Sequence, residues 1–221
     1  MPIATNEFYH IFNRGNNKQQ IFKDDLDRAR LLFLFLYFQS PITFSQVGRV
    51  SNPFVKHRVF DISKEQTKEI ASTRFVELVN FALMPNHFHI TVYESKKDGI
   101  MQYMQRTLNA YTKYFNTRHK QSGHLFQGPY KAVHIRNERQ LLYLSAYIHR
   151  NPRELRDWKN KEHRYPWSSF QDYHTENRWG ALLAHEIITE QFSNKKEYKE
   201  FVDKSGAKEL EKELGESDIL W

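Results

Sequence analysis

Two strand-like segments joined by a short turn constrain the fold of this chain more than any other feature. Residues 75–83 are rich in Val, Leu and Phe, and residues 87–93 alternate polar and apolar side chains. Met84-Pro85-Asn86 between them has the residue types of a turn. Because successive side chains of a strand point to opposite faces, this pattern predicts a β-hairpin with one face on a hydrophobic core.

The segments on either side of this hairpin complete a regular alternation of strands and helices. Residues 8–12 are rich in β-forming side chains, and residues 24–38 begin with acidic residues and continue with an apolar helical face. Residues 98–120 have helical spacing, residues 125–135 favour a last strand that is interrupted near Gly128-Pro129, and residues 138–150 favour a third helix. The order predicts an α+β, ferredoxin-like β-α-β-β-α-β fold, with an antiparallel sheet, helices on one face and a further helix after the last strand.

Length and pattern together suggest one domain with an appendage. The chain has 221 residues, which suits a compact domain better than two. We expect this domain over residues 1–175, with an insertion at about 42–73 where turn signals surround a polar stretch. Residues 176–221 are expected to form a helical C-terminal extension.

Composition narrows the chemistry. The chain contains no cysteine, which excludes disulfides, thiolate metal sites and cysteine nucleophiles. Its 33 Lys and Arg residues against 26 Asp and Glu give a formal charge of +7, which favours a polyanionic partner, although a merely basic soluble protein has the same balance. We see neither a secretory signal nor an apolar run long enough to span a bilayer, and we expect a cytoplasmic protein that does not contact a membrane.

His87-Phe88-His89 is the first candidate for chemistry. In a strand, residues i and i+2 share a face, so the two imidazoles would project side by side and Phe88 would face the core. Two nitrogens at this spacing can share one divalent cation. Two alternatives stay open: a pair of histidines on a wetted sheet face, or a zinc site, although no cysteine or nearby histidine completes a tetrahedral set.

The third helix supplies the second candidate. Tyr143, Tyr147 and Asn151 are spaced four residues apart and therefore lie on one helical stripe. A tyrosine here can attack a phosphodiester when a metal stabilises the charge that develops, and Asn151 can present an amide oxygen as a further ligand. The alternative is that these tyrosines belong to the core and that Asn151 caps the helix before Pro152.

Four motifs taken together resemble the REP-associated tyrosine transposases, a group within the IS200/IS605-like Y1 transposase superfamily. They lie between about residues 8 and 170, in the order of that family, and leave residues 42–73 and the tail after 175 uncovered. The motifs are Tyr9-His10-Ile11-Phe12-Asn13-Arg14-Gly15-Asn16-Asn17, Leu83-Met84-Pro85-Asn86-His87-Phe88-His89, Ser122-Gly123-His124-Leu125-Phe126-Gln127-Gly128 and Tyr147-Ile148-His149-Arg150-Asn151-Pro152.

This resemblance implies a site of the HUH endonuclease type with Mg²⁺ or Mn²⁺ as cofactor. His87 and His89 match the two histidines of the HUH motif, and Tyr147 matches the nucleophile. Asn151 occupies the position where IS200-like members carry Gln, so the third metal ligand would be one methylene shorter. The implied activity is that of a single-strand DNA transposase and endonuclease, which cleaves and rejoins hairpin-bearing, REP-like DNA through a 5′-phosphotyrosine intermediate.

Several basic residues are candidates to hold such DNA. Arg14 and Lys131 lie inside or beside the matched motifs, and Arg118 and Lys120 close the second predicted helix. Two other functions remain open at this stage. A non-catalytic single-strand nucleic-acid-binding module has the same ferredoxin-like layout, and a metal-dependent nuclease that uses water would cleave without a covalent adduct. The family also leaves open whether the protein acts as a monomer or a homodimer.

Overall fold

A four-stranded antiparallel sheet forms the centre of the computed structural model, which describes residues 3–206. Its strands are β1 (Phe8–Arg14), β2 (Val76–Met84), β3 (His87–Glu94) and β4 (Lys131–Ile135), in the spatial order β2-β3-β1-β4. In this order each pair of strands that a helix connects along the chain runs parallel, with an antiparallel strand between them. The predicted ferredoxin-like α+β fold is confirmed.

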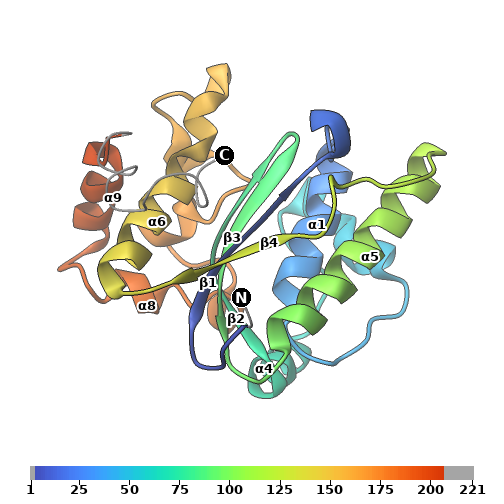
Figure 1. Cartoon of the computed structure of the whole chain (residues 1–221), viewed down its shortest axis with the longest axis horizontal. Helices are drawn as coiled ribbons and strands as arrows, with labels where there is room; N and C mark the ends of the chain where they lie inside the picture. Colours follow the sequence, from blue (N-terminus) through green and yellow to red (C-terminus); the bar gives the residue numbers. More distant parts are fainter. Residues whose placement is uncertain (1–2, 207–221) are drawn as a thin grey trace.

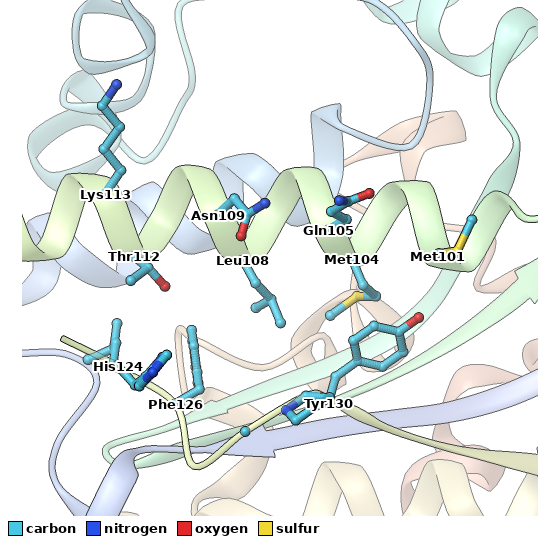
Figure 2. Close-up of a pocket in the computed structure, with 13 residues that line it drawn as sticks. Met101, Met104, Gln105, Leu108, Asn109, Thr112, Lys113, His124, Phe126 and Tyr130 are labelled. Carbon is cyan, nitrogen blue, oxygen red and sulfur yellow. The ribbon is translucent and has the colours of Figure 1, made fainter.

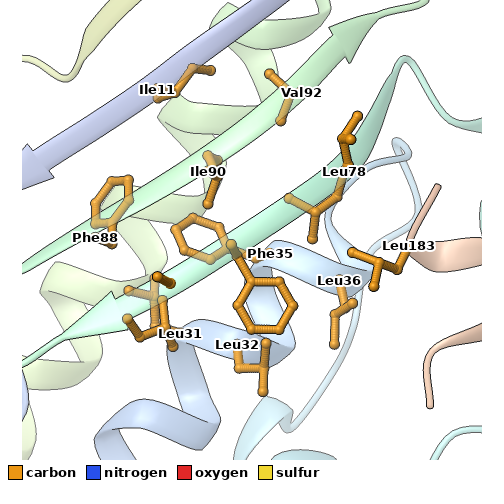
Figure 3. Packing of buried hydrophobic residues seen from close by; sticks show 14 of the residues in the cluster. Ile11, Leu31, Leu32, Phe35, Leu36, Leu78, Phe88, Ile90, Val92 and Leu183 are labelled. Carbon is orange, nitrogen blue, oxygen red and sulfur yellow. The ribbon is translucent and has the colours of Figure 1, made fainter. Parts of the chain in front are cut away.

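Helices α1 (Asp25–Tyr37) and α5 (Gly99–His119) cover one face of the sheet (Figure 1). Asp24 caps α1, since its side chain accepts a hydrogen bond from the Asp27 amide, as its acidic start predicts. Apolar side chains from the sheet and α1 interlock between the two layers (Figure 3). They include Ile11, Leu31, Leu32, Phe35, Leu36, Phe88, Ile90 and Val92, none of them more than 1% exposed.

Helix α6 (Glu138–Arg150) packs against the opposite face of the sheet, and α9 (Lys195–Lys204) packs on α6 (Figure 1). Asn137 caps the start of α6 through the Gln140 amide. Short helices connect these two elements. They are η2 (Asn151–Glu154), η3 (Arg156–Trp158), η4 (Glu162–Arg164), α7 (Phe170–His174), η5 (Gly180–Leu182) and α8 (Glu186–Thr189).

The segment predicted as an insertion is folded against α1. It contains α2 (Val47–Ser51), α3 (Pro53–His57) and α4 (Lys64–Thr73). Outside this segment, the short helix η1 (Asn16–Lys18) lies between β1 and α1. Ser63 and Gln66 form a capping box at the start of α4. Phe54 and Ile70 bury their side chains, which fixes the segment to the rest of the domain.

Two regions differ from the sequence patterns. The last strand was expected from residue 125, but β4 begins at Lys131, because Gly128 adopts φ +140° and Pro129 cannot donate to a ladder. In the tail, α9 buries Tyr198 and Val202, so part of the expected extension is packed, and residues 207–221 of it lie outside the described residues. Within residues 3–206 no helix is long and apolar enough to cross a membrane.

Candidate active site

His87 and His89, the two candidate metal ligands, lie at the start of β3, on the sheet face that α6 covers. His87 pairs with Arg14 and His89 pairs with Phe12 in the register of β1 and β3. Their ring centroids are 5.1 Å apart at an interplanar angle of 85°. Phe88 between them points to the other face, where its ring meets Phe35. The alternation of the strand therefore brings both imidazoles to one side, as their spacing predicts.

Helix α6 places Tyr147 against this pair. The Tyr147 ring lies edge-on to His89, with centroids 5.4 Å apart and an interplanar angle of 86°. Tyr143, one turn earlier, contacts Phe201 of α9 instead, with centroids 5.3 Å apart. Of the two tyrosines on the stripe, the structure thus brings Tyr147 to the histidines and directs Tyr143 toward the tail.

Asn151 lies where α6 ends, and its amide is oriented by two contacts. Its Nδ2 donates to the Tyr147 carbonyl oxygen at 3.0 Å, which turns Oδ1 toward His87 Nε2, 3.3 Å away. The other ring nitrogen of His87, Nδ1, lies 2.7 Å from Asn86 Oδ1. Asn151 therefore both caps the helix and faces the histidine pair, which joins two roles that the sequence left as alternatives.

Each ring nitrogen of His87 faces an amide oxygen, but a neutral imidazole has only one N–H, so it can donate to only one of the two oxygens. Burial lowers the pKa of His87; the contact with Asn151 raises it, and the charge of Arg14 lowers it further. When Nδ1–H donates to Asn86 at the shorter distance, the Nε2 lone pair and the Asn151 oxygen face each other. Two lone pairs in this arrangement suit a shared cation. Among the described residues no group of three His, Cys, Asp or Glu could hold a metal, so such a site would consist of two imidazoles and an amide.

His10 of β1 is a member of this site that the sequence analysis quoted in a motif but did not single out. Its Nε2 lies 2.9 Å from His89 Nδ1, and the two rings stack with centroids 5.1 Å apart. Burial lowers the pKa of His10 to about 3 and the pKa of His89 well below its usual value, where the charges of His10 and His87 add to the effect. Both rings are therefore neutral near pH 7. Phe12 also stacks on His89.

The four basic residues predicted to hold DNA separate into two groups. Arg14 ends β1 opposite His87, and its Nε donates to Gln127 Oε1 at 2.9 Å. The Nζ of Lys131 lies 5.7 Å from the centroid of the Phe12 ring. Both thus border the histidine pair.

Arg118 and Lys120 belong to the α5 side of the sheet and are not brought to this site. Arg118 forms ion pairs with Asp24 and Asp27 at 2.5 and 2.6 Å, and the bond to Asp24 is the main reason that its pKa is raised. Lys120 is the exposed residue that ends α5. As DNA contacts, all four basic residues stay predictions.

Comparison with known proteins finds a family model that matches part of the chain. Residues 46–151 match the model of the family described as IS200-like transposases. The resemblance to the IS200-like transposases is confirmed. This IS200-like segment includes both histidines of the HUH motif, Tyr147 and Asn151. A solved structure of the REP-associated tyrosine transposase bound to a REP hairpin is similar over 87% of this chain and 92% of that chain, with 15% identity and a TM-score of 0.49. No curated protein matches the chain in sequence.

The far side of α6 holds the IS200-like segment to the C-terminal tail through buried polar contacts. His149 Nδ1 lies 2.6 Å from the Tyr198 hydroxyl of α9, and its Nε2 lies 2.8 Å from Ser169 Oγ. The Tyr198 hydroxyl also donates to Ser145 Oγ at 3.2 Å. Arg150 donates to two carbonyl oxygens at the end of α9. Sequence reasoning missed this network, although His149 lies in a quoted motif.

A groove of about 760 Å³ lies apart from the histidine pair, between α5 and the loop at residues 124–130 (Figure 2). Met104, Leu108, Phe126 and Tyr130 give it an apolar wall, and polar side chains of α5 such as Lys113 border it. None of the residues of the HUH motif lines it, so the groove is not part of the site described above.

Proposed function

We propose that this chain is a metal-dependent single-strand DNA endonuclease and strand transferase that acts on hairpin-bearing, REP-like DNA, with Tyr147 as the nucleophile. One observation carries the proposal: the Tyr147 ring lies edge-on to His89 while the Asn151 oxygen faces His87 Nε2. A passive binding module has no need of a tyrosine held against two imidazoles. The motifs shared with REP-associated transposases supply the class of substrate.

His87, His89 and Asn151 would hold Mg²⁺ or Mn²⁺. This donor set fits the ion for two reasons. Asn151 offers a hard oxygen, and burial keeps the two imidazoles neutral and able to ligate. When bound, the cation acts as a Lewis acid that neutralises charge on the scissile phosphate. Arg14 and Lys131 border the pair and would position the phosphates on either side.

Tyr147 carries out the transfer in this proposal. Its hydroxyl oxygen forms a bond to phosphorus as the bond from phosphorus to the 3′ oxygen breaks, and the phenol proton is lost to solvent while the departing 3′ oxygen gains one. The product is a 5′-phosphotyrosine and a free 3′-hydroxyl. Because the new bond conserves the phosphodiester energy, a 3′-hydroxyl can attack it and rejoin the strand without a nucleotide cofactor.

We further propose that Tyr147 serves the histidine pair of its own chain, so that a monomer suffices. This is supported by the contact of Tyr147 with His89 and by the buried bonds of His149 on the other side of α6. Mixing Tyr147→Phe with His87→Ala provides the test. The mixture should stay inactive, whereas recovered activity would mean that subunits of a homodimer exchange their tyrosine helices.

The experiment for the proposed function uses a DNA hairpin with a single-stranded flank, labelled at its 5′ end or its 3′ end. With Mn²⁺, a denaturation-resistant adduct should carry the 3′ label, and the 5′-labelled fragment should be released with a free 3′-hydroxyl. Chelation of the metal should abolish both products. Tyr147→Phe should form no adduct, and the matched variant Tyr143→Phe should form it at the wild-type rate.

Each alternative function gives a different result in the same assay. Cleavage without an adduct identifies a nuclease that activates water. Retained binding of the hairpin with neither cleavage nor adduct identifies a binding module. An adduct that persists in Tyr147→Phe would assign the nucleophile to another residue.

A further inference from the structure

Two neighbouring side chains beneath the histidine pair have polar atoms that no hydrogen bond satisfies. His10 of β1 and Thr91 of β3 stand directly opposite each other in the antiparallel register, and both are fully buried. Thr91 lies two residues after His89 and therefore shares its face of the sheet. Within residues 3–206, His10 Nδ1 and Thr91 Oγ1 have no hydrogen-bond partner.

Unsatisfied buried polar atoms are costly, by about 1–3 kcal/mol each, and call for an explanation. Side chains directly opposite each other in an antiparallel pair have Cβ atoms about 4.5–5.5 Å apart, close enough for His10 and Thr91 to bond directly or through one water. Aromatic rings confine the imidazole of His10, which stacks on Phe12 and meets Tyr147 edge-on. The ring therefore has a fixed orientation in which Nε2 faces His89.

The contact between His10 Nε2 and His89 Nδ1 links the tautomers of the two rings. Each ring is neutral and has one N–H, and one of the two facing nitrogens must donate. In the first arrangement His89 donates from Nδ1, which leaves its Nε2 lone pair free and puts the proton of His10 on Nδ1. In the second, His10 donates from Nε2, and His89 then has its proton on Nε2, where it blocks ligation of a metal.

We propose that His10 is a positioning residue for the metal site: when the cation binds, His10 accepts the Nδ1–H of His89, and Thr91 accepts the Nδ1–H of His10 directly or through one water, so that His89 Nε2 is free to bind the cation. A free neutral imidazole favours a proton on Nε2, so the ligating tautomer of His89 needs such an acceptor. A hydrogen-bonded neighbour commonly fixes the tautomer of a histidine that binds metal. The inference rests on the proposed metal site at His87 and His89.

Metal binding and ring protonation test this directly. In ¹⁵N-labelled protein with Mg²⁺, long-range ¹⁵N–¹H spectra should show the proton of His10 on Nδ1, although His10 does not touch the metal. His10→Phe keeps the ring stack and removes the acceptor, so the affinity for Mn²⁺ measured by titration calorimetry should fall 10–100-fold. His10→Gln, whose side-chain oxygen reaches the place of Nε2, should restore most of it.

Thr91 offers the graded control. Thr91→Val should lower the Mn²⁺ affinity less than His10→Phe does, and Thr91→Ser, which keeps the hydroxyl, should restore it. The affinity for hairpin DNA, measured without metal, should stay constant in all four variants. A variant that merely unfolds would instead lose its affinity for DNA as well as its affinity for Mn²⁺. Wild-type affinity for Mn²⁺ in His10→Phe, or a proton on Nε2 of His10 with Mg²⁺ bound, would overturn the positioning role while adduct formation by the wild-type protein still stood. A wild-type protein that neither binds Mn²⁺ nor forms the adduct would instead refute the proposed function.

Discussion

The two faces of the sheet are built from the same strands but have opposite chemistry. Toward α1 and α5, side chains such as Ile11, Phe88 and Ile90 are fully buried and wholly apolar. Toward α6, the equally buried positions include His10, His89 and Thr91, with the ring of Phe12 stacked among them. One-residue steps along β3 from Phe88 to Val92 therefore alternate between the hydrophobic core and a buried polar layer.

The difference separates stability from function. Apolar burial contributes about 25 cal/mol per Å², whereas a buried polar atom without a partner opposes folding. Two atoms of the polar layer, His10 Nδ1 and Thr91 Oγ1, have no hydrogen-bond partner within residues 3–206 and therefore cost stability instead of adding to it. Substitutions on the two faces should accordingly have distinct consequences.

Removing a proposed metal ligand should have the largest effect on activity and little effect on folding. His87→Ala deletes one imidazole, and the lost stabilisation of charge should lower the rate of adduct formation by about 10³-fold. His57→Ala removes an exposed histidine at the end of α3 and should leave the rate unchanged. Labelled hairpin DNA and denaturing gels measure both rates, and equal rates for the two variants would contradict the metal-site assignment.

A substitution on the apolar face should show the reverse behaviour. Phe35 is fully buried, and its ring meets that of Phe88 with centroids 5.1 Å apart. Phe35→Ala leaves a cavity and should lower the free energy of unfolding by about 3–5 kcal/mol in urea titrations. The affinity of the folded variant for Mn²⁺ should match that of the wild type. If the free energy of unfolding fell by less than about 1 kcal/mol, or if the affinity for Mn²⁺ changed strongly, the two faces would not have separate roles.

Acid should destabilise the protein through its buried histidines. Burial lowers the pKa of His10 and of His149 to about 3 in the folded state, against about 6.5 in the unfolded chain. The unfolded state therefore binds more protons below pH 6.5, so the stability is fully present above that pH and is lost as the pH falls toward 3. At pH 5 each group should account for about 2 kcal/mol of lost stability relative to pH 7.5.

Urea titrations at the two pH values measure this loss, and His10→Phe supplies its control. The variant lacks one of the two groups, so the difference in stability between pH 7.5 and pH 5 should shrink by about 2 kcal/mol. An unchanged difference would mean that His10 is not held neutral by burial.

The smallest effect is expected where an unsatisfied polar atom is replaced by a methyl group. Thr91→Val preserves the shape of the side chain and removes a buried hydroxyl without a hydrogen-bond partner among the described residues. The free energy of unfolding should therefore stay the same or rise by up to about 1 kcal/mol. A loss of 2 kcal/mol or more would show that Thr91 already makes a strong bond in the metal-free protein.

Periodicity predicted the fold because it reflects the burial of whole elements. The alternation in residues 87–93 and the helical spacing in residues 98–120 both survive in β3 and α5. The four-residue spacing of Tyr143, Tyr147 and Asn151 predicted one stripe, of which Tyr147 and Asn151 contact the histidine pair while Tyr143 contacts Phe201. For the last strand, the interruption at Gly128 and Pro129 was predicted, but the strand assigned to the residues before it was wrong, because β4 begins only at Lys131.

Contacts between distant segments could not be predicted from local patterns. His10 and His89 meet across two strands, 79 positions apart in the chain, and His149 meets Tyr198 of the tail across 49. Neither pair has a local spacing that identifies it. Arg118 illustrates the same limit, because its position at the end of α5 suggested a DNA contact while Asp24 and Asp27 occupy its guanidinium.

The location of a bound metal tests the central claim most directly. Crystals of the protein with Mn²⁺ and a hairpin DNA, measured at the manganese absorption edge, should give one strong anomalous peak on the α6 face of the sheet. It should lie about 2.0–2.3 Å from His87 Nε2, His89 Nε2 and Asn151 Oδ1, the range of ordinary nitrogen and oxygen ligands. A peak elsewhere, or adduct formation by a protein that binds no metal at these residues, would contradict the account.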